Sequence, residues 1–214
     1  MLIAALPTMI GAEAVSCPDA PLFAVHTCVE VDARPDQVWP HVIRFDPLPV
    51  PDDRTFHTGL AYPVRAEIDG RGVGALRRCV FSTGAFVEPI EVWDEPRLLR
   101  FVVTSNPRPM REWNPFAEIH PPHLDGFLIA RRGEFRLTEI AGGYTRPEGT
   151  TWYQHHLWPA AYWRLWSDVV IHRIHRRVLE HIERSAEGDP RSPRDPPVAG
   201  AHSEPVNNRP RQPF

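Results

Sequence analysis

The chain has 214 residues, a length that suits one domain with tails, and 42% of them are apolar, which allows a core without disulfides or metal. The net charge of −3 excludes a strong general attraction to nucleic acid or anionic lipid. All 24 basic residues are arginines, which excludes Schiff-base and lysine-base chemistry. Cys17, Cys28 and Cys79 lack CxxC spacing, so we expect a reducing compartment, the cytoplasm, and no zinc site.

The two ends of the chain differ from its middle. Residues 1–21 begin with an apolar stretch that is too short to span a bilayer, and no basic residue precedes its signal-like Ala12-Glu13-Ala14. We expect an irregular arm or the remnant of a membrane segment, with a weak signal peptide as the third alternative. Residues 187–214 are rich in proline and poor in apolar residues, so we expect a disordered tail. The folded domain is predicted over 22–186.

Strand and turn signals follow one another along the domain. Residues 22–31 alternate as a strand does, and a short amphipathic helix follows, with Pro35 in its first turn. A second short helical or irregular connection reaches Gly59. Six more strands with short turns are predicted at 61–68, 74–82, 86–93, 97–104, 132–140 and 146–158. The short turns indicate an antiparallel meander.

The last predicted element is a helix from Ala160 to about Ser185. Large apolar residues recur on it at three- and four-residue steps, which predicts one core-facing stripe. The stripe consists of Trp163, Trp166, Val170, Ile174, Val178 and Ile182.

Three stretches, 29–46, 86–103 and 150–182, resemble the START-like (SRPBCC) superfamily, closest to its polyketide cyclase/dehydrase and lipid-transfer branch. The resemblance implies an α+β helix-grip fold. In it, a curved antiparallel sheet of about seven strands wraps a long C-terminal helix, and two short helices follow the first strand. It also implies a cavity for a small hydrophobic ligand, but no reaction, because the superfamily has no universal catalytic signature. The chain also resembles soluble ends of membrane-anchored proteins.

The connection 106–130 is long and rich in aromatic residues, among them Trp113 and Phe116. Loops of this length inside a compact domain are usually functional or disordered. We expect a lid over the cavity. The alternatives are a surface that contacts a membrane or a membrane protein, as the arm 1–21 could also do, and plain packing.

Strand alternation selects candidate polar residues for the cavity. If Phe86 and Ile90 face inward, so does Glu88, whose desolvated carboxyl could act as a general acid or base. Arg77 or Arg111 could neutralise it. A solvent-facing position or a cross-strand ion pair is the plainer alternative, and we favour it.

On the last strand, one face carries Tyr153 and His155 and the other carries Trp152 and His156; we expect the first face inside. His120, His123 and Asp125 have the spacing of metal ligands. However, they lie in a loop with two prolines, where no regular structure holds the side chains on one face, so we expect no metal. His172 and His175 lie outside the apolar stripe, which favours exposure or edge packing over catalysis. His181 lies on the stripe and is expected in the core.

The favoured hypothesis is binding, with transfer as an additional role, of a lipid, fatty-acyl or polyketide-like molecule by a monomer without cofactor or nucleic-acid partner. The predicted ligand contacts are Arg77, Phe86, Glu88, Ile90, Trp113, Phe116, Tyr153, His155, Trp163, Trp166 and Val170. One alternative is a cyclase or dehydratase that uses Glu88, His155 and Arg111. The other is a sensor or interaction domain of a membrane-associated protein.

Overall fold

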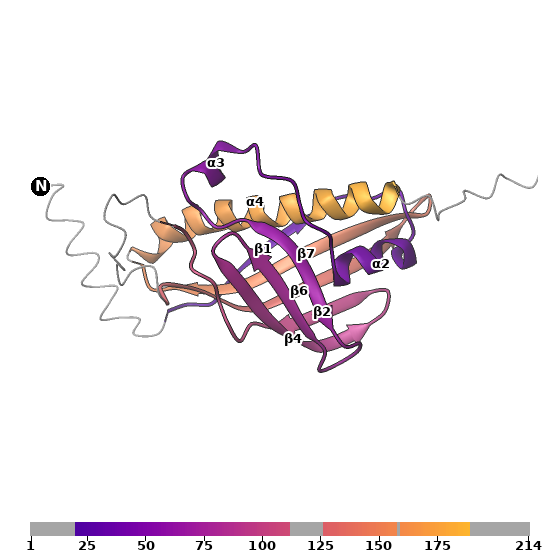
Figure 1. Ribbon diagram of the computed structural model, residues 1–214, viewed down its shortest axis with the longest axis horizontal. Helices are drawn as coiled ribbons and strands as arrows, with labels where there is room; N and C mark the ends of the chain where they lie inside the picture. Colours follow the sequence, from indigo (N-terminus) through magenta and orange to yellow (C-terminus); the bar gives the residue numbers. More distant parts are fainter. Residues whose placement is uncertain (1–19, 112–125, 158, 189–214) are drawn as a thin grey trace, which may run out of the picture.

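The computed structural model describes residues 20–111, 126–157 and 159–188 (Figure 1). Most of the predicted arm and tail lie outside these ranges, as do Trp113, Phe116 and the stretch from His120 to Asp125.

One antiparallel sheet forms the body of the described residues. Its seven strands are β1 (Phe23–Cys28), β2 (Pro63–Asp69), β3 (Leu76–Phe81), β4 (Gly84–Asp94), β5 (Leu98–Val102), β6 (Leu128–Ile140) and β7 (Tyr144–His155). Their order is β1-β7-β6-β5-β4-β3-β2, so consecutive strands from β2 to β7 are neighbours and β1 joins the far edge of β7. The predicted meander is therefore confirmed. The turn after β2 holds Gly70 and Gly72 at φ +86° and +85°, which glycine adopts without a steric penalty.

Two short helices lie between β1 and β2, as predicted. α2 (Pro35–Ile43) begins at a proline, which has no N–H to leave unsatisfied in the first turn. It buries Val38, Trp39 and Val42 in the core. α3 (Arg54–His57) is capped by Asp53, whose carboxylate accepts a hydrogen bond of 2.8 Å from the Thr55 N–H.

The long helix α4 (Ala160–Glu187) runs along the sheet (Figure 1) and packs against β1, β7 and α2. Its C-terminal half is buried in the core through Val178, Leu179 and Ile182. The N-terminal half corrects the predicted stripe, because Trp166 is 52% exposed and Trp163 is 36% exposed. These two rings border a cavity instead of packed side chains. No helix of the described residues has both the length and the apolar character needed to cross a membrane.

We predict that Gly133→Ala destabilises the fold. Gly133 lies on β6 opposite Phe101 of β5, and a Cβ added there would overlap the Phe101 ring. The expected loss is about 1–3 kcal/mol of unfolding free energy, the usual cost of overpacking a core, measured by urea denaturation. Gly149→Ala on β7 is the matched control, since its Cβ would lie an ordinary 3.5 Å from the Phe135 ring. Equal stability of both variants would contradict this packing.

Candidate ligand-binding cavity

A cavity of about 710 Å³ lies between the sheet and the N-terminal half of α4. Aromatic and aliphatic side chains form most of its wall. The sheet and its connections contribute Phe45, Phe81, Phe86, Phe101, Val103 and Phe135, and α4 contributes Trp163, Trp166, Val170, Ile171, Ile174 and Val178. Ligand pockets in proteins commonly measure about 300–1,000 Å³ and have such apolar walls. The size and lining therefore suit a small hydrophobic molecule.

Arg77 and Glu88 form a buried ion pair in the cavity wall. They are direct partners in the register of β3 and β4, and the Arg77 guanidinium donates to the Glu88 carboxylate. Arg77 also donates from Nε to the Ile43 carbonyl at 3.1 Å. The sequence offered a cavity-facing Glu88 and a cross-strand ion pair as alternatives. In the structure both hold, because the paired residues also line the cavity.

Both side chains of the pair are buried. Burial raises the pKa of Glu88, against the opposing effect of the Arg77 guanidinium. Burial alone would lower the pKa of Arg77, but the Glu88 carboxylate outweighs it and the pKa is raised. The Phe101 and Phe135 ring centroids lie 5.4 and 5.5 Å from the Arg77 guanidinium carbon, which adds cation–π attraction.

Cys79 follows Arg77 on the same face of β3 and also lines the cavity. Burial raises the pKa of its thiol to about 12. The thiol therefore stays protonated at neutral pH, which argues against thiolate chemistry here.

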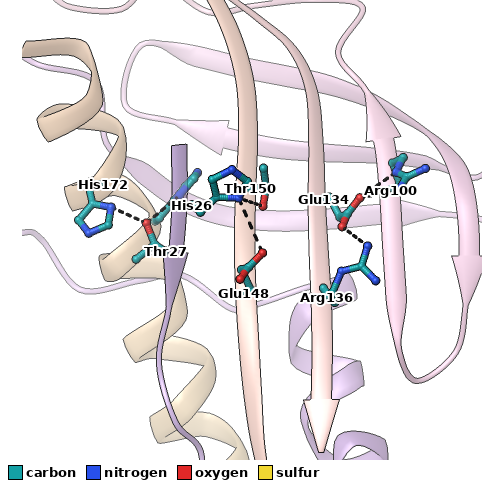
Figure 2. Close-up of polar contacts among 9 residues, drawn as sticks. His26, Thr27, Arg100, Glu134, Arg136, Glu148, Thr150 and His172 are labelled. Atoms are coloured by element: carbon teal, nitrogen blue, oxygen red, sulfur yellow. Dashed lines mark hydrogen bonds and ion pairs between the residues drawn. The ribbon is translucent and has the colours of Figure 1, made fainter. Parts of the chain in front are cut away.

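A second polar group lies where β1 and β7 face α4. His175 Nδ1 is 3.1 Å from Thr27 Oγ1, and His175 Nε2 is 2.7 Å from Thr151 Oγ1. His172 Nδ1 reaches the same Thr27 oxygen at 2.8 Å (Figure 2). Burial lowers the pKa of His175 to about 3, with smaller contributions from His172 and His26. His175 is therefore a neutral imidazole in the cavity wall.

Tyr153 lies beside this group on β7. Its hydroxyl donates to Asp168 Oδ1 at 2.6 Å, and Arg164 donates to Oδ2 at 3.3 Å. Burial, followed by the Asp168 carboxylate, raises the pKa of Tyr153. The phenol therefore stays protonated and its donor is already engaged.

Both described ends of the 106–130 connection line the cavity, through Asn106–Met110 on one side and Phe127, Leu128 and Ala130 on the other. The Asn106 amide joins the two ends: it accepts from the Ala130 N–H at 2.8 Å and donates to the Ala130 carbonyl at 3.2 Å. Asn106 therefore pairs with Ala130 as a neighbouring strand would.

The predicted contacts separate into two groups. Those that line the cavity are Arg77, Phe86, Glu88, Tyr153, Trp163, Trp166 and Val170. Ile90, His155 and Arg111 do not line it, which corrects their assignment. Ile90 and His155 are buried in packed parts of the molecule, and exposed Arg111 donates its backbone N–H to the Gly59 carbonyl at 2.7 Å. The acid-base trio of Glu88, His155 and Arg111 therefore does not converge.

The sequence did not single out Thr151 and His175, which line the cavity, or Thr27, which contacts His175. One local signal existed, because Thr27 and Val25 alternate as the inward side of β1. Within the described residues, no group of three or more His, Cys, Asp and Glu side chains is arranged to hold a metal.

By sequence, neither a family model nor a curated protein matches the chain. Among solved structures, the Zhui aromatase/cyclase from Streptomyces sp. R1128 has a TM-score of 0.51 and 14% identity, covering 78% of this chain and 94% of that one. The chain has the helix-grip fold. The helix-grip fold that the sequence resemblance implied is thereby confirmed.

Other helix-grip structures align with lower scores. Norcoclaurine synthase from Thalictrum flavum has a TM-score of 0.48 and 13% identity, covering 78% of this chain and 96% of its own. Ara h 8.0201 has a TM-score of 0.46 and 11% identity, covering 78% and 98%. At such identities the likeness concerns the fold, and the residues of the cavity must support any function themselves.

We predict that Glu88→Leu costs about 3–5 kcal/mol of stability, because it leaves the Arg77 charge buried without a partner. The double variant Arg77→Met/Glu88→Leu should recover most of this loss. Glu67→Leu, which breaks the exposed ion pair with Arg65, is the control and should cost less than about 1 kcal/mol. Urea denaturation measures all three. A double variant no more stable than Glu88→Leu would refute the role of the unpaired charge.

We also predict a pH dependence of stability from His175. The unfolded chain takes up a proton near the ordinary pKa of 6.5, whereas the folded chain does so only near 3. The contribution of the neutral ring to the unfolding free energy is therefore fully present above about pH 6.5. It is lost as the pH falls toward 3, by up to about 1.4 kcal/mol per pH unit. His175→Gln should flatten the slope between pH 6.5 and 4.

Urea denaturation at several pH values measures this slope. His156→Gln, at an exposed position just after β7, serves as the control and should keep the wild-type slope. An unchanged slope in His175→Gln would show that this ring is not the responsible group.

Proposed function

We propose that the protein binds a small hydrophobic molecule of the lipid, fatty-acyl or polyketide-like class in the cavity beneath α4. The observation that carries this proposal is the cavity of about 710 Å³ with its largely apolar wall. Protein interiors are normally close-packed, and an unfilled space forfeits contacts on every side chain around it. A ligand that fills the space would restore those contacts and stabilise the fold.

Trp163 and Trp166 support a route into the cavity from the N-terminal half of α4. Both rings line the cavity and both are also partly exposed to solvent. They therefore stand at its mouth. Exposed Tyr162, Leu165 and Val169 continue the apolar surface on the same half of the helix. Such a surface favours entry of an apolar molecule from solvent or from a carrier.

The structure supports ligand binding better than acid-base catalysis by Glu88, His155 and Arg111. Glu88 is engaged by Arg77, and His155 and Arg111 do not line the cavity. Fold likeness to an aromatase/cyclase raises interest in polyketide-like ligands without assigning that activity to this chain.

Two neighbouring valines on α4 provide the test. Val170 lines the cavity, whereas Val169 is 41% exposed and lies outside it. Val170→Phe fills part of the cavity and should weaken ligand binding about tenfold or more, while Val169→Phe should leave it unchanged. Native mass spectrometry of protein purified from cells identifies a retained molecule, and thermal shifts with fatty acids and aromatic polyketides give affinities.

Protein without a retained molecule and without a shift from any member of the panel would overturn the proposal. So would equal effects of the two phenylalanine variants.

A further inference from the structure

Four side chains form a continuous polar chain from the cavity to solvent. Thr151 lines the cavity and contacts His175, which in turn contacts Thr27. Thr27 contacts His172, which is exposed to solvent. The three contacts measure 2.7, 3.1 and 2.8 Å. Figure 2 shows His172 of α4 directed at Thr27 of β1, whereas His26 and Thr150 meet each other separately.

Hydrogen-bond chemistry gives this chain a direction. The Thr27 hydroxyl has one proton and two acceptor lone pairs, so it can donate to only one of the two imidazole nitrogens that it faces. Each neutral ring also has one donor and one acceptor nitrogen. If Thr151 donates to His175 Nε2, then His175 Nδ1–H donates to Thr27, and the Thr27 proton is available to His172 Nδ1.

The middle of the chain is suited to passing a proton rather than holding one. Burial and the nearby His172 and His26 keep the His175 pKa well below neutrality. His172, at the outer end of the chain of contacts, is exposed to solvent. The Thr151 hydroxyl uses one bond to His175 and retains acceptor capacity toward the cavity.

We propose that the chain Thr151–His175–Thr27–His172 is a proton relay that ionises an acidic hydroxyl, a phenol or an enol, on the bound ligand. This inference rests on the proposed ligand binding and assigns a chemical class to the ligand. The ligand proton passes to Thr151 Oγ1 as the Thr151 proton passes to His175 Nε2. The His175 Nδ1 proton passes to Thr27, and the Thr27 proton passes to His172.

The products of this transfer balance in protons and charge. The ligand oxygen carries one negative charge and receives a hydrogen bond from Thr151, and His172 carries one positive charge. No proton is consumed from elsewhere and no bond between heavy atoms changes. In the reverse direction, the relay returns the proton to the ligand oxygen.

Other charged and titratable groups around the relay define the controls. His26 lies on the outward side of β1 and bonds to Thr150, and Tyr153 of β7 donates to Asp168 of α4, which Arg164 also contacts. The charged residues that line the cavity are Arg77, Glu88, Arg108, Arg132 and Glu134. The hydrogen bonds of His26, Tyr153 and the Arg77–Glu88 pair go to residues other than Thr27 and Thr151, so these groups can be held constant while the relay is cut.

The test uses 7-hydroxycoumarin, whose neutral and anionic forms absorb at different wavelengths, and 7-methoxycoumarin, which cannot ionise. The full chain is titrated with each probe between about pH 5 and pH 9. In wild-type protein, bound 7-hydroxycoumarin should ionise at a pH about one unit lower than in Thr151→Val, Thr27→Val or His172→Gln, a tenfold change in the ionisation constant. Thr27→Val and His172→Gln, which change residues outside the cavity lining, should bind 7-methoxycoumarin as the wild type does.

Thr150→Val is the matched control, because Thr150 neighbours Thr151 on β7 but bonds to His26 instead. It should keep the wild-type ionisation. The same ionisation in wild type and in all three relay variants would overturn the relay while 7-methoxycoumarin binding upholds the cavity. Binding of neither coumarin would also overturn it, and the lipid and polyketide thermal shifts would then decide separately whether the cavity binds ligands at all.

Discussion

The anchoring of α4 at one end shapes the rest of the molecule. Leu179 and Ile182 are fully buried against the core that α2 and the sheet provide. A helix of 28 residues is about 42 Å long, so its N-terminal half extends well beyond this anchor. There, Trp163 and Trp166 border a cavity instead of a packed interior. The same helix thus stabilises the fold at one end and lines the candidate binding site at the other.

Polar groups inside such a wall need partners, and the sheet register supplies them. Arg77 lies opposite Glu88 on adjacent strands, and Arg100 lies opposite Glu134. Glu134 accepts from Arg100 and from Arg136, each at 2.8 Å (Figure 2). Because an unpaired buried charge is costly, these pairings restrict which substitutions the strands tolerate. The register therefore determines both the sheet and the position of the polar groups in the cavity.

Periodicity in the sequence predicted the seven strands, α2 and α4, because alternation and three- to four-residue spacing are local, whereas α3 was expected only as a helical or irregular connection. Alternation also selected Phe86, Glu88 and Tyr153, which line the cavity. It misplaced Ile90 and His155 because it identifies a face of a strand and not how far the cavity extends along it. His175 was missed because its threonine partners lie 24 and 148 residues away in the chain. No local pattern reports such contacts.

The two polar sites of the cavity lie far apart in the order of the sheet. Arg77 and Glu88 belong to β3 and β4, whereas Thr27 and Thr151 belong to β1 and β7 on the other side. A single ligand that contacts both needs oxygen functions at separate points on an apolar skeleton. A simple fatty acid has only one polar end, so that end could contact only one of the two sites. Among the proposed classes, a hydroxylated polyketide-like molecule therefore fits the distribution of polar groups best.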